Sequence, residues 1–145
     1  MQPLTKTIEP ATPVPTPAVQ RSAAMILLVE DERFVREVMC KVLRAAGHRV
    51  VMSENAAQAR RAFRLHGGEI ELLITDVIMP GEDGRKLANS LRTRNPQLRT
   101  LFISGYPETA TEGRRRIRTC EFYLPKPFSA ASLSEKVDGI LRRLD

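Results

Sequence analysis

The sequence ELLITD at residues 71–76 is followed at once by VIMPG at residues 77–81. The apolar run predicts a short strand that ends on the carboxylate of Asp76, and proline with glycine predicts a sharp turn after it. An open α/β sheet presents reactive groups in this way, although a single aspartate after a strand is more often a turn or helix cap. Asp76 becomes a candidate functional residue only if other segments supply groups that act with it.

Strand and helix patterns alternate outward from this stretch in both directions. The predicted strands are Met25–Val29, Arg49–Ser53, Glu71–Thr75, Thr100–Ser104 and Glu121–Leu124. The predicted helices run from Val35 to Gly47, from Asn55 through Phe63, from Gly84 to about Asn95, from Glu108 to Arg118 and from Ala130 to Leu144. Alternating βα units require right-handed crossovers. The sequence therefore predicts an α/β, (βα)5 doubly wound domain with a five-stranded parallel sheet in the flavodoxin-like strand order 2-1-3-4-5.

Local patterns within these segments predict which positions face the core. The apolar positions of the first helix follow a helical period and are expected on one buried stripe: Val35, Val38, Met39, Val42, Leu43 and Ala46. Asn55 with Gln58 resembles an N-cap and its reciprocal partner. The strand 49–53 is partly polar, which favours a position at the edge of the sheet.

Composition and length indicate one folded domain, at residues 24–145, preceded by a proline-rich tail or linker at residues 1–23. Ala23–Val29 is the longest apolar run and is too short to span a membrane, and no signal-peptide pattern is present at the N-terminus. Cys40 and Cys120 lack metal-ligand spacing and are interpreted as reduced thiols. We therefore expect a cytoplasmic protein.

Polar residues at the predicted strand ends form a coherent set. Glu30 and Asp31 follow the first strand, Asp76 ends the third, Ser104 and Gly105 end the fourth, and Lys126 follows the fifth. Clustered carboxylates repel one another unless a cation lies among them, and oxygen ligands favour Mg²⁺. A neighbouring lysine is consistent with the arrival of further negative charge. A carboxylate nucleophile, a divalent ion, an ammonium and a hydroxyl together predict phosphorylation of an aspartate.

Four segments, taken jointly and in order, resemble the receiver domain of two-component response regulators. They are LLVEDE at 27–32, TDVIMP at 75–80 with Gly84, ISG at 103–105 and YLPKPF at 123–128. The resemblance covers residues 25–145, and no single segment would be specific.

The resemblance implies a role for each matching position. Asp76 would be the phosphoacceptor, Asp31 a direct Mg²⁺ ligand, and Glu30 a ligand acting through water. The backbone carbonyl of Ile78 would complete the protein ligands. The remaining roles fall to Lys126, Ser104 and Gly105 at the phosphoryl group, and to Ser104 with Tyr123 as the switch pair. The family also implies a cis peptide between Lys126 and Pro127, which the proline permits.

Two further positions bear on the lifetime of the phosphoryl group. Ile78 and Tyr106 occupy sites that flank the path of the hydrolytic water in this family. Because both side chains are bulky, we expect that water to be hindered and the phosphoryl group to be long-lived.

The resemblance also implies the partners, a histidine kinase or a histidine phosphotransfer protein that donates the phosphoryl group. Only 19 residues follow Lys126, so we expect no DNA-binding output domain, and a free regulator and a hybrid-kinase receiver both stay open. The net charge of +6 includes the basic run at residues 114–118. We interpret that run as a solvated face or an acidic-partner surface, and expect no nucleic-acid binding because stacking aromatics are not interleaved with it. A non-phosphorylated binding module is the alternative function. A metal-dependent phosphatase is disfavoured, because no acid stands two residues after Asp76.

Overall fold

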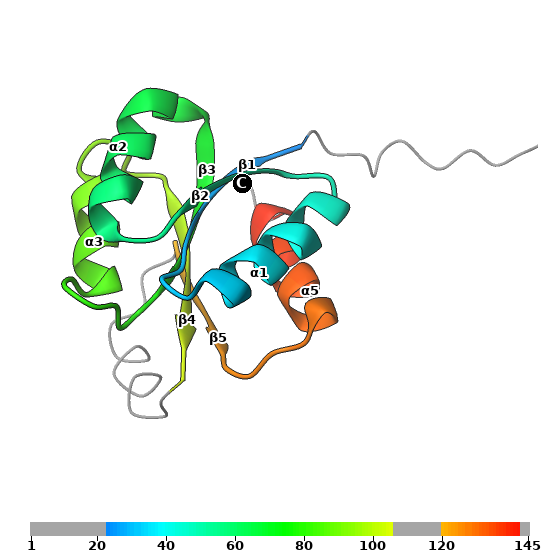
Figure 1. Cartoon of the computed structure of the whole chain (residues 1–145). Helices are drawn as coiled ribbons and strands as arrows, with labels where there is room; N and C mark the ends of the chain where they lie inside the picture. Colours follow the sequence, from blue (N-terminus) through cyan, green and yellow to red (C-terminus); the bar gives the residue numbers. More distant parts are fainter. Residues whose placement is uncertain (1–22, 106–119, 143–145) are drawn as a thin grey trace, which may run out of the picture.

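The structure, a computed structural model, describes residues 23–105 and 120–142. In this part of the chain, five parallel strands form one sheet in the order β2-β1-β3-β4-β5 (Figure 1). The strands are β1 (Met25–Val29), β2 (Arg49–Ser53), β3 (Ile70–Asp76), β4 (Arg99–Ser104) and β5 (Glu121–Pro125). The helices are α1 (Arg33–Ala45), α2 (Ala56–His66), α3 (Gly84–Arg92) and α5 (Ala130–Arg142), with a 3₁₀ turn η2 (Gly67–Glu69). The predicted fold class, strand order and edge position of β2 are confirmed.

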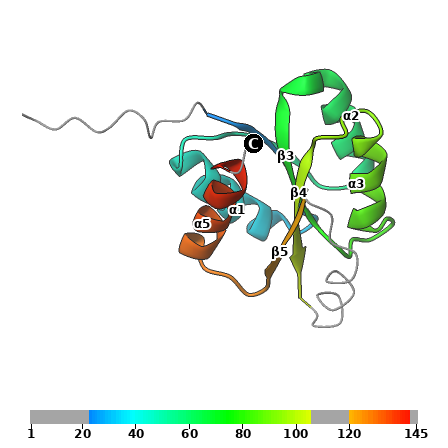
Figure 2. The same ribbon diagram turned by 180° about the vertical axis from the view of Figure 1, so that it is seen from behind.

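Helices cover both faces of the sheet. Helices α1 and α5 lie side by side on one face, and α2 and α3 lie side by side on the other (Figures 1 and 2). Each helix pair shares a separate apolar cluster with its face of the sheet. The central strands are therefore buried from both sides, which explains their nearly continuous apolar sequences.

Some predicted boundaries shift by a few residues. Strand β3 includes Asp76 itself, and α3 ends at Arg92 rather than near Asn95. The chain keeps turning beyond α3, because the backbone N–H groups of Arg94 and Asn95 both donate to the carbonyl of Leu91, at 3.0 and 3.1 Å. Predicted features that fall outside the described residues are the tail before residue 23, the helix at 108–118 and the last turn of the C-terminal helix.

The prediction of the buried stripe on α1 is partly wrong. Met39 and Leu43 are buried as expected, but Val38 is 44 % exposed and Ala46 is also exposed. Cys40 is buried instead. Helix α1 packs against α5 as well as the sheet, so its buried stripe is turned toward Cys40 and away from Val38.

The predicted cap of α2 is confirmed, with one difference. The side chain of Asn55 accepts a hydrogen bond from the Gln58 backbone N–H at 2.8 Å. The Gln58 side chain reaches back to the backbone N–H of Glu54, at 3.0 Å, rather than to that of Asn55. Both bonds satisfy backbone donors at or before the first turn and fix where α2 begins.

A buried arginine joins α3 to strands β4 and β5. The guanidinium of Arg92 contacts the carboxylate of Glu121 at 2.6 Å and the hydroxyl of Thr100 at 3.2 Å. The two charged side chains are only 8 % and 11 % exposed, so each compensates for the desolvation of the other.

In the described residues no helix is long and apolar enough to cross a bilayer. Cys40 and Cys120 are both free thiols, as expected from the sequence.

Candidate functional site

The register of the sheet brings the predicted strand-end residues together. Val29 of β1 pairs with Thr75 of β3, so Glu30 lies beside Asp76 at the carboxyl edge. On the other side of β3, Asp76 pairs with Ile103, and Ser104 follows directly. Ser104 in turn pairs with Pro125, so Lys126 comes next. One edge of the sheet therefore collects residues that are up to 96 positions apart, at the point where the strand order reverses.

Three carboxylates form the centre of this edge. Glu30, Asp31 and Asp76 each offer an oxygen, and these oxygens all lie within 4.8 Å of one another. Glu30 and Asp76 are buried, whereas Asp31 is exposed. The carboxylates open onto a cavity of about 340 Å³, which is also lined by Ile78, Ser104, Gly105 and Lys126.

Backbone contacts hold Glu30 in this position. Its N–H donates to the carbonyl of Ser53 at 3.1 Å, and its carboxylate accepts from the Glu32 N–H at 3.0 Å. The guanidinium of Arg36 donates to the Glu30 carbonyl at 2.8 Å. Helix α1 thus supplies a cation that fixes the end of β1.

The loop between β3 and α3 is tightly closed at its base. The Gly84 N–H donates to the carbonyl of Val77 at 2.7 Å, and the Thr75 hydroxyl donates to the carbonyl of Asp76 at 3.0 Å. A Cβ placed on Gly84 would lie 1.9 Å from the carbonyl oxygen of Asp76. Glycine is therefore required at position 84, because any side chain would collide with the backbone of the candidate phosphoacceptor.

Lys126 is the charge partner of Asp76. Its Nζ lies 3.3 Å from Oδ1 of Asp76, an ion-pair contact that does not have hydrogen-bond geometry. The backbone N–H of Lys126 donates to the carbonyl of Ser104 at 2.8 Å, and the peptide bond between Lys126 and Pro127 is cis, as the resemblance implies. Ser104 is buried at 8 % exposure. A Cβ at Gly105 would meet no atom within 4 Å among the described residues, which is consistent with open space for an incoming group.

The other predicted residues lie around this centre. Ile78 stands on the rim, 63 % exposed, and Tyr123 is half-buried in β5 with its ring centroid 5.2 Å from that of Phe102. The guanidinium of Arg85 donates to the Tyr123 hydroxyl at 3.4 Å. Tyr106 lies outside the described residues, so its position beside the site stays a prediction.

Burial and mutual repulsion shift the titration of the buried acids. Burial, with the charge of Asp76 as a smaller cause, raises the pKa of Glu30 to about 7, although the Glu32 N–H opposes the shift. Burial also raises the pKa of Asp76, against the opposing charge of Lys126. Burial acts to lower the pKa of Lys126, but the charges of Asp76 and Glu30 outweigh it and raise that pKa. The site as it stands carries an excess of carboxylates over cations.

The donor set fits a magnesium ion. Oδ1 of Asp76 is buried and accepts no hydrogen bond in the described part of the chain, so this oxygen has a lone pair that could coordinate a cation. Two further carboxylates are within reach of the same point, and hard oxygen ligands are those that Mg²⁺ prefers. Glu30, Asp31, Asp76 and the backbone carbonyl of Ile78 are the groups that would hold it.

Magnesium affinity is expected to rise with pH. The folded-state pKa of Glu30, about 7, lies above its ordinary value of 4.5, so the folded protein holds a proton that the unfolded chain has released. That contribution to stability is complete below about pH 4.5 and is lost as the pH rises through about 7. Because Mg²⁺ competes with this proton, the dissociation constant of Mg²⁺ should fall by about tenfold for each unit that the pH rises toward 7. Above pH 7 it should stay constant. Isothermal titration calorimetry at several pH values measures this, and an unchanged slope in Glu30→Gln would contradict the assignment to Glu30.

The fold and the site define a class of protein, a doubly wound α/β domain with an acidic, lysine-flanked cation pocket where its strand order reverses. The chain belongs to the response regulator receiver domain family, whose model matches residues 26–138. It is therefore a receiver domain of two-component signalling.

Individual relatives support this assignment. The chain is 36 % identical over 124 residues to the sensor kinase CckA of Brucella abortus, covering 85 % of this chain but 13 % of that protein. It is 33 % identical to the response regulator receiver protein CpdR of the same organism, covering 80 % of this chain and 95 % of that one. The crystal structure of the CckA receiver domain matches with a TM-score of 0.70 at 37 % identity, over 81 % of this chain and 99 % of that chain. The chain spans 13 % and 49 % of the first two curated relatives, CckA and PetR of Rhodobacter capsulatus.

Several residues that shape the site had no signal in the sequence. Arg36 supports Glu30, and Arg85 contacts Tyr123. Arg60 of α2 pairs with Glu82 of the β3–α3 loop, 22 positions away. Exposed arginines are common on helices, and only the packing of α2 against α3 distinguishes Arg60 from its neighbours. The close approach between Gly84 and the backbone of Asp76 was partly indicated by the sequence, because Gly84 is one of the positions that match the receiver-domain motifs.

Proposed function

We propose that this chain accepts a phosphoryl group on Asp76 from a phosphohistidine of a histidine kinase or a histidine phosphotransfer protein. The observation that carries the proposal is the position of the Asp76 carboxylate, between two further carboxylates and the ammonium of Lys126, in one open cavity. Residues 24–145 form the receiver domain in this proposal, and residues 1–23 form a tail or linker.

The residues divide the chemistry as follows. An oxygen of Asp76 attacks phosphorus while the bond to the histidine nitrogen breaks, and Lys126 neutralises charge on the transferred oxygens. Bound Mg²⁺ would supply further neutralisation of the transition state and relieve the repulsion among the carboxylates. Gly105 leaves space for the group to approach.

In the phosphorylated state of this proposal, the oxygens of the phosphoryl group are new hydrogen-bond acceptors beside Ser104. We propose that the Ser104 hydroxyl turns toward the phosphoryl oxygens and vacates space into which Tyr123 moves. Tyr123 is the central residue of the edge strand β5 and pairs with Phe102 of β4, so its movement would change the surface that this side of the domain offers to a partner protein. Arg85, which contacts the Tyr123 hydroxyl at 3.4 Å, would be released by the same movement.

The output is a protein interaction in this proposal, without DNA binding, and the site of action is the cytoplasm. Two relatives support the two possible settings. CpdR is matched over 95 % of its length, which supports a single-domain regulator. CckA is matched over 13 %, at a receiver within a sensor kinase, which supports a hybrid-kinase setting.

The proposal is tested by incubating the protein with acetyl phosphate in the presence and absence of Mg²⁺ and recording the intact mass. We expect a gain of one phosphoryl group that requires Mg²⁺. An unchanged mass would favour the alternative, a non-phosphorylated protein-binding module. A salt-sensitive gel shift with unrelated duplexes would test residual nucleic-acid binding, and we expect nothing specific.

The phosphoryl group is expected to decay slowly. Ile78 stands at the rim of the cavity, where its exposed side chain can obstruct an attacking water. Replacing Ile78 with alanine should speed the loss of the phosphoryl group several-fold in Mg²⁺, because the backbone carbonyl is retained while the obstruction is removed. The decay of the phosphorylated mass over time measures this. A decay rate that is the same in Ile78→Ala and the wild type would show that Ile78 does not control access.

A further inference from the structure

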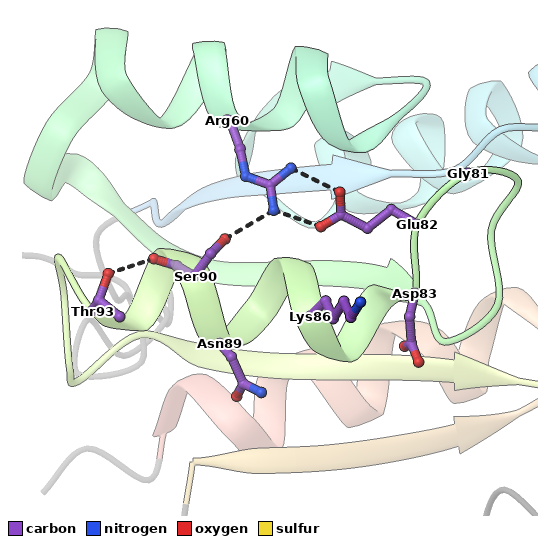
Figure 3. Close-up of a pocket in the computed structure, with 8 residues that line it drawn as sticks. All are labelled: Arg60, Gly81, Glu82, Asp83, Lys86, Asn89, Ser90 and Thr93. Atoms are coloured by element: carbon purple, nitrogen blue, oxygen red, sulfur yellow. Dashed lines mark hydrogen bonds and ion pairs between the residues drawn. The ribbon is translucent and has the colours of Figure 1, made fainter.

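A bidentate ion pair joins α2 to the loop between β3 and α3. Figure 3 shows Arg60 extending from α2 across the groove to Glu82 on the loop and Ser90 on α3. The two nitrogens of the Arg60 fork contact the two carboxylate oxygens of Glu82 at 3.0 and 2.5 Å. One of these nitrogens also donates to the Ser90 hydroxyl at 3.2 Å. The side chains are 33 % and 24 % exposed, so the pair is partly shielded from water.

The geometry of the pair restricts where Glu82 can lie. A bidentate arginine–carboxylate contact fixes orientation as well as distance, because two parallel bonds must form at once. The Arg60 nitrogen that contacts Oε2 of Glu82 also donates to Ser90, whose hydroxyl donates to the carbonyl of Leu87 at 2.9 Å within α3. Helices α2 and α3 therefore act together as the anchor for Glu82.

Among the described residues, few other polar contacts hold the outer part of the β3–α3 loop. Its two ends are fixed: Val77 N–H donates to the Ile103 carbonyl at 3.1 Å, and Asp83 caps α3 by accepting from the Arg85 N–H at 2.7 Å. Between these ends lie Pro80 and Gly81, both exposed, and Gly81 adopts a φ of +87°. Residues 80 and 81 form a tight turn, and among the described residues no backbone hydrogen bond joins residues 80–82 to another strand or helix. The Arg60–Glu82 pair is the side-chain contact that connects this segment to α2, and the charge of Lys86 on α3 also acts on Glu82.

We infer that the Arg60–Glu82 ion pair is a positioning device that holds the β3–α3 loop where the Ile78 carbonyl and the Asp76 carboxylate bind one Mg²⁺ ion together. The inference rests on the proposed function, because it concerns the same cation site. Ile78 lies only four positions before Glu82, with the buried side chain of Met79 between them. Release of Glu82 would let the exposed turn at residues 80–81 swing, and the carbonyl of Ile78 would lose its fixed direction.

The test measures the Mg²⁺ dissociation constant of Glu82→Gln and Arg60→Gln by isothermal titration calorimetry, with melting temperatures recorded in parallel. We expect both variants to bind Mg²⁺ roughly tenfold more weakly, at the lower end of what loss of an outer-shell partner costs. Long-range electrostatics alone predicts opposite signs, because Glu82→Gln removes negative charge near the cation and Arg60→Gln removes positive charge. Weakening by both changes is therefore specific to positioning.

Two further variants complete the experiment. The reversed pair Arg60→Glu with Glu82→Arg should recover most of the lost affinity, since it restores the contact with the charges exchanged. Arg142→Gln breaks an exposed ion pair to Asp138 on α5 and should bind Mg²⁺ as the wild type does. Wild-type affinity in both single variants, with or without a lower melting temperature, would overturn the inference alone. Failure of the wild type to bind Mg²⁺ would overturn the proposed function and the inference with it.

Discussion

Replacing Asp76 with asparagine is expected to abolish phosphorylation by acetyl phosphate while leaving the protein folded. The amide of asparagine lacks the anionic oxygen that attacks phosphorus and is a poorer Mg²⁺ ligand than a carboxylate. The intact mass after incubation with Mg²⁺ and acetyl phosphate should therefore show no phosphoryl group. The melting temperature should not fall, because the substitution removes a buried carboxylate that lies beside Glu30 and whose pKa burial raises.

A matched control for this variant lies on the same loop. Asp83 is exposed and caps α3 through a 2.7 Å bond from the Arg85 N–H, and asparagine caps helices equally well. Asp83→Asn should be phosphorylated at the wild-type rate. Labelling of Asp76→Asn at another residue, located by peptide mapping, would overturn the assignment of Asp76 as the acceptor.

Replacing Gly84 with alanine is expected to have the largest effect on stability. The added Cβ would lie 1.9 Å from the carbonyl oxygen of Asp76 and 3.2 Å from the hydroxyl of Thr75. The nearest atom is backbone, so either the end of β3 or the start of α3 must shift. We expect a loss of about 3 kcal/mol in the free energy of unfolding, as for severe overpacking. The same shift should displace Asp76 from Lys126 and lower the rate of phosphorylation.

Gly139 provides the control for this change. It lies on α5, is exposed, and a Cβ there would meet no described atom within 4 Å. Alanine in an exposed helix interior is favoured over glycine, so Gly139→Ala should raise the stability by about 0.5–1 kcal/mol. Chemical denaturation of both variants measures the contrast. Equal stability of Gly84→Ala and the wild type would mean that the loop can relax around the new methyl group.

Much of the fold could be predicted because its signals are local. The apolar run of β3 and the glycine and proline after it report burial and a turn at neighbouring positions. The predicted cap at Asn55 is present, since it depends on residues three apart. The stripe of α1 failed at Val38 because its neighbours include α5, which lies more than 80 positions away in the sequence. Periodicity predicts that a helix has a buried face, but the packing partners decide how far that face is turned.

The candidate site, like the fold, could be predicted only in part. Once the strand order was predicted, Glu30, Asp31, Asp76 and Lys126 had to meet, because parallel strands share one carboxyl edge. The supporting contacts had no such rule. Arg60 and Glu82 meet because helices α2 and α3 pack together on one face of the sheet, and Gly84 meets the backbone of Asp76 because the β3–α3 loop closes tightly at its base.

The sequence by itself therefore determined the class of fold, the acids and lysine at the strand ends, and the residue that accepts the phosphoryl group in our proposal. Each of these depends on residue type and on short-range periodicity, which the chain carries locally. Only the tertiary structure decided how buried each carboxylate is, which side chains hold the β3–α3 loop, and why position 84 must be glycine. The burial and the loop contacts depend on distances between segments far apart in the chain, which exist only after the helices have packed on the sheet. The close approach at position 84 depends on how the β3–α3 loop closes in three dimensions, which residue types alone do not specify.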